Sequence, residues 1–181
     1  MNQVLKTIAE RNSCRNFSPA PIPEGQVAEL VNAALAAPSA LNRQPWQIIV
    51  ITDKQLLDEM DAHTMAVLKA ENEFFYNRMM DRGGKVFYNA PCLIVIAKDD
   101  SDYATMDSGI VSQTIALAAH SMGLGSVICA VAANTFKGDK YKNLIPEGFS
   151  FGISVVVGMA ISGKDPHELE PNKVTYIRGE Q

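Results

Sequence analysis

The stretch Arg11–Phe17 reads RNSCRNF and carries two arginines and a serine at every second position, just before a proline-rich turn over residues 18–23. In an extended segment the side chains of Arg11, Ser13 and Arg15 leave the same side of the chain. Two guanidinium groups beside a hydroxyl suit a phosphate, because each guanidinium binds two oxygens and the hydroxyl fills the gap. The other interpretation is an ordinary basic turn whose charges are solvated. This stretch alone leaves both open.

Outward from this stretch, four segments have helical periodicity. They cover residues 2–10, 23–37, 55–81 and 107–122. The third has an irregular apolar face, so we expect a break within it. The fourth is apolar nearly all round, which indicates burial on more than one side. That burial can arise at the centre of a monomer or at a subunit interface.

Runs rich in β-branched residues predict buried strands. They cover residues 47–52, 92–97, 127–131 and 151–160. We expect Asn134 to start a short helix that runs to about residue 144. Residues 173–178 alternate like an edge strand or a docked tail. No repeat, linker or low-complexity block interrupts the pattern, so one domain is expected over residues 1–181.

Composition narrows the classes of function. The 181 residues carry a formal net charge of -4, which argues against broad nucleic-acid binding but leaves room for a local basic pocket. No apolar run approaches the length of about 18 residues that spans a membrane, and the first residues lack a secretory signal. We therefore expect a cytoplasmic protein. Its three cysteines, at wide spacings, indicate reduced thiols.

The chain is poor in catalytic side chains. His63, His120 and His167 stand far apart and in no metal-ligand spacing, so we predict no metal site. Cys14 as a nucleophile lacks a histidine partner in the sequence. The glycines around Leu124 follow a helix rather than a strand and do not complete a dinucleotide-binding fingerprint. Either the protein is not an enzyme, or a cofactor carries the chemistry.

Two loops hold the remaining polar groups. The first is Arg11–Phe17, which suits a phosphate. The second contains Ser39, Asn42 and Gln44 beside Trp46, and its amides suit the polar edge of a planar heterocycle. A ring with polar edges and a phosphate tail points to flavin mononucleotide (FMN).

Three blocks of the sequence resemble the nitroreductase family of FMN-dependent flavoproteins. RNSCRNF at 11–17 is similar to the family's R-R-S-x-R-x-F opening, and APSALNRQPW at 37–46 resembles its A-P-S-x-x-N-x-Q-P-W loop. Residues 107–126 are similar to its long central helix with the G-L-G-S turn that follows. The blocks occur in the family's order, and the second is the most specific.

The resemblance implies an α+β homodimer with a central, mostly antiparallel mixed sheet wrapped by helices, FMN at the subunit interface and a C-terminal tail that could be exchanged between subunits. Arg11, Asn12, Ser13 and Arg15 would bind the phosphate, the ribityl chain or the pyrimidine edge. Further contacts are implied for Pro38, Ser39, Asn42 and Gln44, from the partner subunit, for the backbone of Leu124 and Gly125, and for Lys173 on the phosphate.

The activity implied is ping-pong hydride transfer from NADH or NADPH through FMN to a small acceptor such as a nitroaromatic or a quinone. No side-chain acid is required for it. Three alternatives remain: a flavin store or sensor without turnover, a reductive dehalogenase of the same fold, and an anion-binding module without flavin. Residues 58–85 would shape access to the site as a lid.

Overall fold

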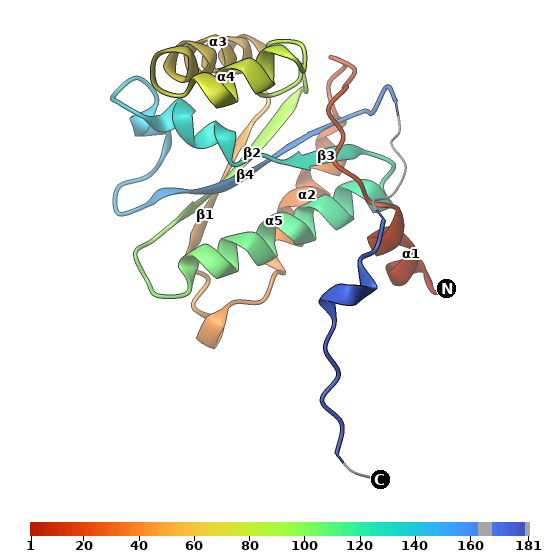
Figure 1. The fold of residues 1–181 in the computed structure, drawn as a ribbon. Helices are drawn as coiled ribbons and strands as arrows, with labels where there is room; N and C mark the ends of the chain where they lie inside the picture. Colours follow the sequence, from red (N-terminus) through yellow and green to blue (C-terminus); the bar gives the residue numbers. More distant parts are fainter. Residues whose placement is uncertain (163–167, 180–181) are drawn as a thin grey trace.

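A four-stranded antiparallel sheet forms the centre of the computed structural model, which describes residues 1–162 and 168–179 (Figure 1). Its order is β1-β2-β4-β3. The strands are β1 (Trp46–Ile51), β2 (Cys92–Lys98), β3 (Gly125–Ile128) and β4 (Ser150–Gly158). The strands predicted at 47–52, 92–97 and 151–160 are confirmed with small shifts of their ends, but β1 is mostly half-buried rather than buried.

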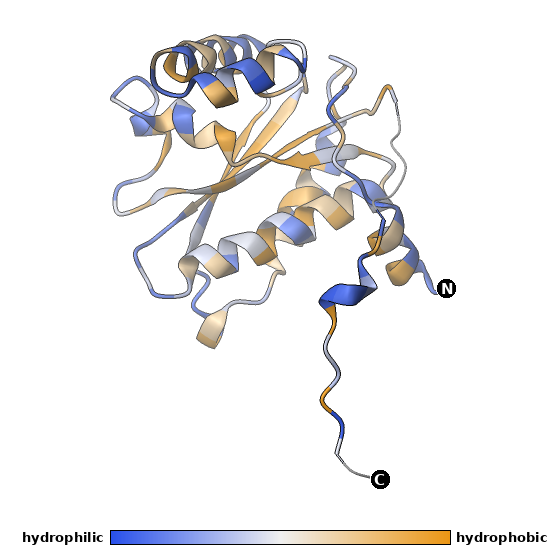
Figure 2. Cartoon of the chain, in the orientation of Figure 1, coloured by the Kyte–Doolittle hydropathy of each residue, from blue (hydrophilic) through white to orange (hydrophobic). Residues whose placement is uncertain are grey.

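Helices cover both faces of this sheet (Figure 1). α3 (Lys54–Glu71) and α4 (Glu73–Met80) lie over one face, while α2 (Glu24–Leu35) and α5 (Ala104–Ser121) lie over the other. The hydrophobic residues concentrate on the sheet between these layers (Figure 2). The fold is therefore α+β, as the resemblance implies.

The central strand β2 packs into both layers at once. Leu93 and Val95 belong to the core on the α3 side, and Ile94 and Ile96 to the core on the α5 side. All four side chains are fully buried. A strand with two buried faces has no polar side, which explains the uninterrupted apolar run in its sequence.

The break expected within 55–81 is confirmed at Asn72. Its backbone N–H donates to the carbonyl of Leu68 at 2.8 Å and ends α3. Its side-chain oxygen accepts a hydrogen bond from the backbone of Phe75 at 3.1 Å and starts α4. The first helix, α1 (Gln3–Glu10), is capped in the same way by Asn2.

β3 differs from its predicted range of 127–131. It begins at Gly125 and ends at Ile128, because its extent is fixed by pairing with β4 rather than by local preference. The bond from Cys129 N to Ser154 O, 2.8 Å long, is the last link to β4. The chain then turns into a 3-10 helix, η2 (Val131–Phe136).

Two more predictions need correction. Asn134 lies inside η2, where its amide donates to the carbonyl of Val131, so it starts no helix. A separate turn, η3 (Lys142–Leu144), follows. Residues 174–179 follow η4 (Pro171–Lys173) without forming a strand, and none of the four strands in the described residues pairs with them. Docking or exchange of this tail stays a prediction.

The sheet also contains less parallel pairing than the expected mixed sheet. Every strand pair in the described residues is antiparallel. Parallel pairing there is limited to an isolated bridge between Ser13 and Ser126. That bridge attaches Arg11–Phe17 to the edge of the sheet.

Candidate functional site

Arg11–Phe17 runs as an extended strap along the sheet edge. Arg11 ends α1, and its backbone N–H donates to the carbonyl of Thr7. Cys14 N donates to Ser126 O at 2.9 Å, and Phe17 forms an antiparallel bridge with Ala160. The strap is therefore held at both ends by backbone pairing.

The strap residues differ in whether they line the neighbouring cavity. Arg11, Asn12 and Cys14 line a cavity of about 210 Å³, which Ser13 and Arg15 do not line. The expectation of a single face for Arg11, Ser13 and Arg15 stays a prediction. Arg11 still belongs to the cap of α1, so the alternation of an extended chain begins only after it.

Arg15 is a half-buried cation with an unmet hydrogen-bonding group. Its Nη1 donates to the carbonyl of Ser13 at 3.4 Å, while its buried Nε has no partner among the described residues. In that part of the chain no carboxylate forms an ion pair with Arg15 or Arg11. Buried donors in native proteins are nearly always satisfied, so this guanidinium is suited to an anionic or carbonyl group from outside the chain.

The wall of the cavity opposite the strap is built from the turn after α5. Leu124 and Gly125, whose backbones are implied by the resemblance to contact the cofactor, both line the cavity. The Leu124 side chain is buried in the α5-side core, so its backbone is the part available to a ligand. A Cβ on Gly125 would lie 2.9 Å from the Cβ and Sγ of Cys14, which explains the glycine.

Cys14 packs rather than reacts in this arrangement. It is 5% exposed and belongs to the core on the α3 side. Its thiol donates to the carbonyl of Asn16 at 3.4 Å. The geometry supports a packing role for this cysteine.

The second polar loop, residues 38–44, is held by a residue that the sequence analysis missed. Asp107 is 3% exposed, and its carboxylate accepts from the backbone N–H of Ala40 at 3.2 Å and 3.3 Å. The sequence indicates this residue only as a single acidic side chain in the first turn of an apolar helix. Ser39 Oγ accepts from Gln44 N at 2.9 Å, and Gln44 donates to the side chain of Asn42 at 3.1 Å.

This loop also stores backbone strain. Leu41, Asn42 and Gln44 have φ of 55°, 52° and 49°, in the left-handed region that non-glycine residues rarely adopt. Pro38 precedes them. Such a conformation persists because Asp107 and Ser39 fix the loop from both ends. The amide groups of Asn42 and Gln44 are thereby held at the surface.

Apart from Lys173, the predicted site residues form two groups at opposite ends of α5 (Figure 1). The 38–44 loop contacts Asp107 in the first turn of α5, and the strap lies beside the turn that follows its last residue. A helix of 18 residues is about 27 Å long. One chain therefore does not bring the two groups together.

Lys173 belongs to neither group. Its ammonium pairs with Glu170 at 2.9 Å in the tail, and its side chain is 71% exposed. It lines none of the cavity beside the strap. Its predicted contact with a phosphate stays a prediction.

His120 is a second residue that the sequence analysis did not assign. It lines the cavity together with Arg11, and its Nε2 lies 3.9 Å from Oε2 of Glu10. A single histidine inside an apolar helix gives no motif. Its place in the last helical turn before the G-L-G-S motif was the available signal. Among the described residues, no three His, Cys, Asp or Glu side chains are grouped to hold a metal.

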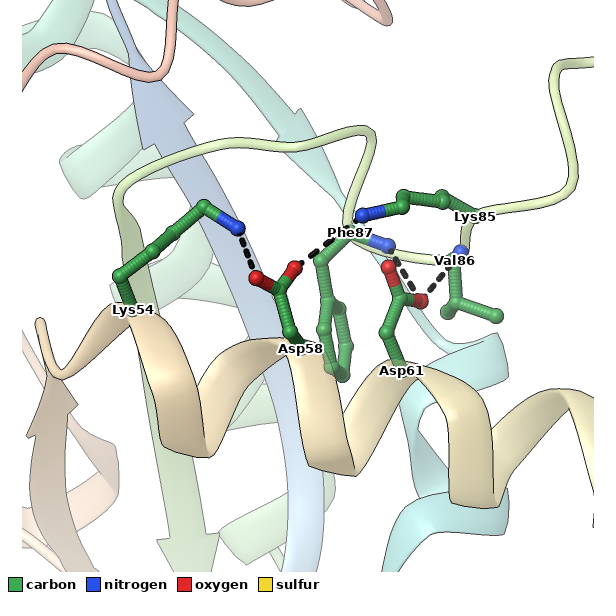
Figure 3. Close-up of polar contacts among 6 residues, drawn as sticks. All are labelled: Lys54, Asp58, Asp61, Lys85, Val86 and Phe87. Atoms are coloured by element: carbon green, nitrogen blue, oxygen red, sulfur yellow. Dashed lines mark hydrogen bonds and ion pairs between the residues drawn. The ribbon is translucent and has the colours of Figure 1, made fainter.

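In the segment expected as a lid, residues 58–85, the first helix α3 is bonded to the chain that precedes β2 (Figure 3). Asp61 accepts from the backbone N–H of Val86 at 2.6 Å and of Phe87 at 3.2 Å, and its burial raises the pKa of its carboxyl against the effect of those bonds. Asp58, exposed beside it, pairs with Lys54 and Lys85, which lower its pKa. Both contacts tie α3 to the chain before β2. Movement of a lid stays a prediction.

Comparison with known proteins agrees with this architecture. Residues 8–143 match the family model described as Nitroreductase family. An FMN-bound nitroreductase structure from Desulfitobacterium hafniense DCB-2 superimposes with a TM-score of 0.93 and 42% identity, covering 98% of this chain and 100% of that one. An NADPH-flavin oxidoreductase from Vibrio harveyi is 28% identical over 98% of this chain and 72% of its own length.

A relative from Methanothermobacter thermautotrophicus, provisionally named NADH dehydrogenase/NAD(P)H nitroreductase, is 30% identical over 68% of this chain. The match spans only 59% of that relative's length. No helix among the described residues is long and apolar enough to cross a membrane. On the strength of the family model, which covers most of its length, the chain belongs to the nitroreductase family.

Proposed function

We propose that this protein is an FMN-dependent oxidoreductase that takes a hydride from NADH or NADPH and delivers it to a small electrophile such as a nitroaromatic or a quinone. The observation that carries the proposal is Arg15, a half-buried guanidinium whose Nε has no partner within the described chain. It lies on the strap that matches the family's opening motif. The relative from Desulfitobacterium hafniense, at 42% identity, has bound FMN.

Different residues of the strap suit different parts of FMN. Arg11 faces the cavity with a charge that no carboxylate of the described chain neutralises, which suits a phosphate. Arg15 lies about 13 Å further along an extended chain, where it would face the ring. Ser13 adds a hydroxyl between them.

When bound, FMN supplies hydride transfer in two half-reactions, first with NAD(P)H and then with the acceptor at the same site. The chain contributes placement and electrostatics. The Arg15 charge, partly shielded from water, stabilises negative charge that develops beside it more strongly than a solvated charge would. No side-chain acid is needed at the reacting atoms.

We infer that the working unit is a homodimer, because each site needs groups from both ends of α5. An antiparallel pairing of α5 helices from two chains would bring the 38–44 loop of one chain to the strap of the other. The outer face of α5 carries exposed Met106 and Ile110, and the neighbouring α1 carries exposed Val4 and Leu5. Burying this apolar surface would drive the association.

Anaerobic flavin reduction tests the proposal directly. The purified protein is expected to bind FMN tightly enough to be yellow, to be bleached by NADH or NADPH, and to be reoxidised by a nitroaromatic or quinone. Bleaching by neither nucleotide would favour a flavin store or sensor. Failure to bind FMN would overturn the proposal and favour an anion-binding module.

A substitution of Arg15 tests its proposed contact with FMN, and a substitution of another basic residue serves as the control. Arg15→Gln removes a charged donor from the proposed ring contact, so it should weaken FMN binding by about 1.5–3 kcal/mol. Lys142→Gln removes a positive charge from the exposed η3, away from the strap, and should leave the affinity unchanged. Titration of apoprotein with FMN, followed by flavin fluorescence, measures both. Equal affinities for the two variants would contradict the role of Arg15.

A further inference from the structure

The 38–44 loop is anchored in the core at its ends and strained in its middle. Ala37, just before it, and Trp46, just after it, are both buried in the core on the α5 side. Leu41 is 86% exposed on a backbone with φ of 55°. An exposed leucine gains nothing locally from a left-handed backbone, so contacts elsewhere must hold this conformation.

Asp107 supplies such a contact next to the strained residues. Its carboxylate accepts from the backbone N–H of Ala40, which directly precedes Leu41, at 3.2 Å and 3.3 Å. The bond from Gln44 N to Ser39 Oγ closes the loop on itself. The Asp107 bond instead ties the loop to a helix 67 residues further along the chain. The loop therefore takes its position from α5.

The part of α5 that carries Asp107 is a firm support. A Cβ on Gly152 of β4 would lie 2.8 Å from the Oγ of Ser108 and 3.3 Å from its Cβ. The helix thus rests on the sheet without room between them, and close packing of this kind resists small shifts. Asp107 passes this fixed position on to the loop.

The carboxylate of Asp107 has a cost that packing alone does not explain. Among the described residues, no basic side chain forms an ion pair with this buried group. Burying an acidic side chain without a counter-ion costs free energy that an apolar side chain would not incur. The dipole of α5 favours an acid in the first turn, but it does not call for a bond to Ala40. That bond is the feature left to explain.

We propose that Asp107 is a positioning residue for the flavin ring. It fixes the 38–44 loop so that the amides of Asn42 and Gln44 meet the ring of the FMN that the strap of the second chain holds. The proposal rests on the function and the dimer proposed above. The outer face of the same helix carries exposed apolar residues of the proposed interface. α5 therefore both joins the two chains and aims the loop from one chain to the other.

Dissociation constants of FMN and of riboflavin, which lacks the phosphate, test the proposal on the dialysed full-length apoprotein. Asp107→Ala should weaken binding of both ligands about tenfold, because they share the ring that the loop is proposed to contact. Asp107→Asn keeps one oxygen acceptor for Ala40 and should weaken both about threefold. Flavin fluorescence during titration measures each constant.

A second set of variants asks whether Asp107 acts through the loop amides. In the Asn42→Ala/Gln44→Ala background these amides are gone, so Asp107→Ala should change riboflavin affinity by less than about threefold. A role confined to the stability of α5, through its dipole or its packing, would instead cost the same factor in both backgrounds. The same tenfold loss with and without the amides would therefore overturn the proposal.

Ser108→Ala is the matched control. Ser108 follows Asp107 in α5 and is also buried, but its Oγ donates within the helix, to the carbonyl of Ala104 at 2.7 Å. The variant removes a buried polar group from the same part of α5 without touching the loop, so both affinities should stay at the wild-type values. Equal losses in Ser108→Ala and Asp107→Ala would show a general disturbance of the helix and would overturn the positioning role.

The outcomes also separate this proposal from the one on which it rests. Wild-type affinities for Asp107→Ala, or a loss confined to FMN, would overturn the positioning role and leave the proposed function standing. So would light scattering that finds Asp107→Ala monomeric where the wild type is dimeric. If Asp107→Ala does not fold, Asp107→Asn decides in its place, and unchanged affinities would count against the proposal. Failure of the wild type to bind FMN would instead refute the proposed function.

Discussion

Gly125 shows how tightly the strap is fitted to the sheet at the scale of one residue. A Cβ there would lie 2.9 Å from the Cβ and Sγ of Cys14 and 3.0 Å from the Cβ of Ala160. These neighbours are short side chains on paired backbone, so neither can move aside. The glycine is required by close approach of two strands and not by a special φ.

Gly125→Ala should therefore destabilise the fold by about 1–3 kcal/mol, the range for overpacked cores. Gly25 in the first turn of α2 has no atom within 4 Å of its ideal Cβ, so Gly25→Ala should be neutral or slightly stabilising. Urea denaturation of both variants measures the difference. Equal stability of Gly125→Ala and wild type would mean that the strap is loosely held.

Elements were predictable where their burial is dictated by their own sequence. The doubly buried β2 and the apolar α5 were found because an uninterrupted apolar pattern can be satisfied in few ways. The break at Asn72 was foreseen from a change in periodicity. β3 was misplaced because its ends depend on pairing with β4, which local preference does not encode. The alternation at 173–178 gave a strand signal without a partner strand in the same chain.

The candidate site was predictable in part for a similar reason. Motif spacing picked out the strap and the 38–44 loop, since their polar residues stand together in sequence. It did not reveal Asp107, which holds the 38–44 loop, or His120, which lines the cavity beside the strap, because both lie within a helix. Nor could spacing show that the two loops lie at opposite ends of α5. That separation follows only from the packed fold.

The two carboxylates on α3, Asp58 and Asp61, should change the stability of the fold in opposite directions as pH rises. Burial raises the pKa of Asp61 in the folded state, so its contribution to stability is full below the unfolded value of about 3.9 and declines as pH rises through the folded value. Bonds to Lys54 and then Lys85 lower the pKa of Asp58. Its contribution is present above about pH 3.9 and is lost as pH falls through its lowered folded value.

Asp61→Asn keeps an oxygen acceptor for the loop before β2 but removes the titration. The stability of wild type relative to Asp61→Asn should decrease as pH rises from about 4 toward 8. The matched variant Asp58→Asn should give the opposite slope below about pH 4, with an amplitude under about 1 kcal/mol because that pair is exposed. Urea denaturation across this pH range measures both. Parallel slopes would contradict the assignment of burial as the dominant influence on Asp61.

At the scale of the whole molecule, the placement of the site links cofactor binding to association. The strap and the 38–44 loop are separated by the length of α5, about 27 Å for its 18 residues. If both groups belong to the proposed FMN site, a monomer would hold two incomplete halves of it. Two chains related by a two-fold axis across α5 would each complete the other, which is the isologous arrangement of most homodimers. The proposed function thus requires that FMN affinity fall when the dimer is disrupted.

Ile110→Asp tests this coupling. Ile110 is 40% exposed on the outer face of α5, so the substitution should leave the monomer folded while placing like charges across the proposed interface. Light scattering after size-exclusion chromatography should show a shift from dimer to monomer, and FMN titration at the same protein concentrations should show a parallel loss of affinity. Asn143→Asp adds the same charge on exposed η3 and should change neither quantity. A monomeric Ile110→Asp variant with wild-type FMN affinity would place the whole cofactor site within one chain, and a variant that stays dimeric would move the interface away from this face of α5.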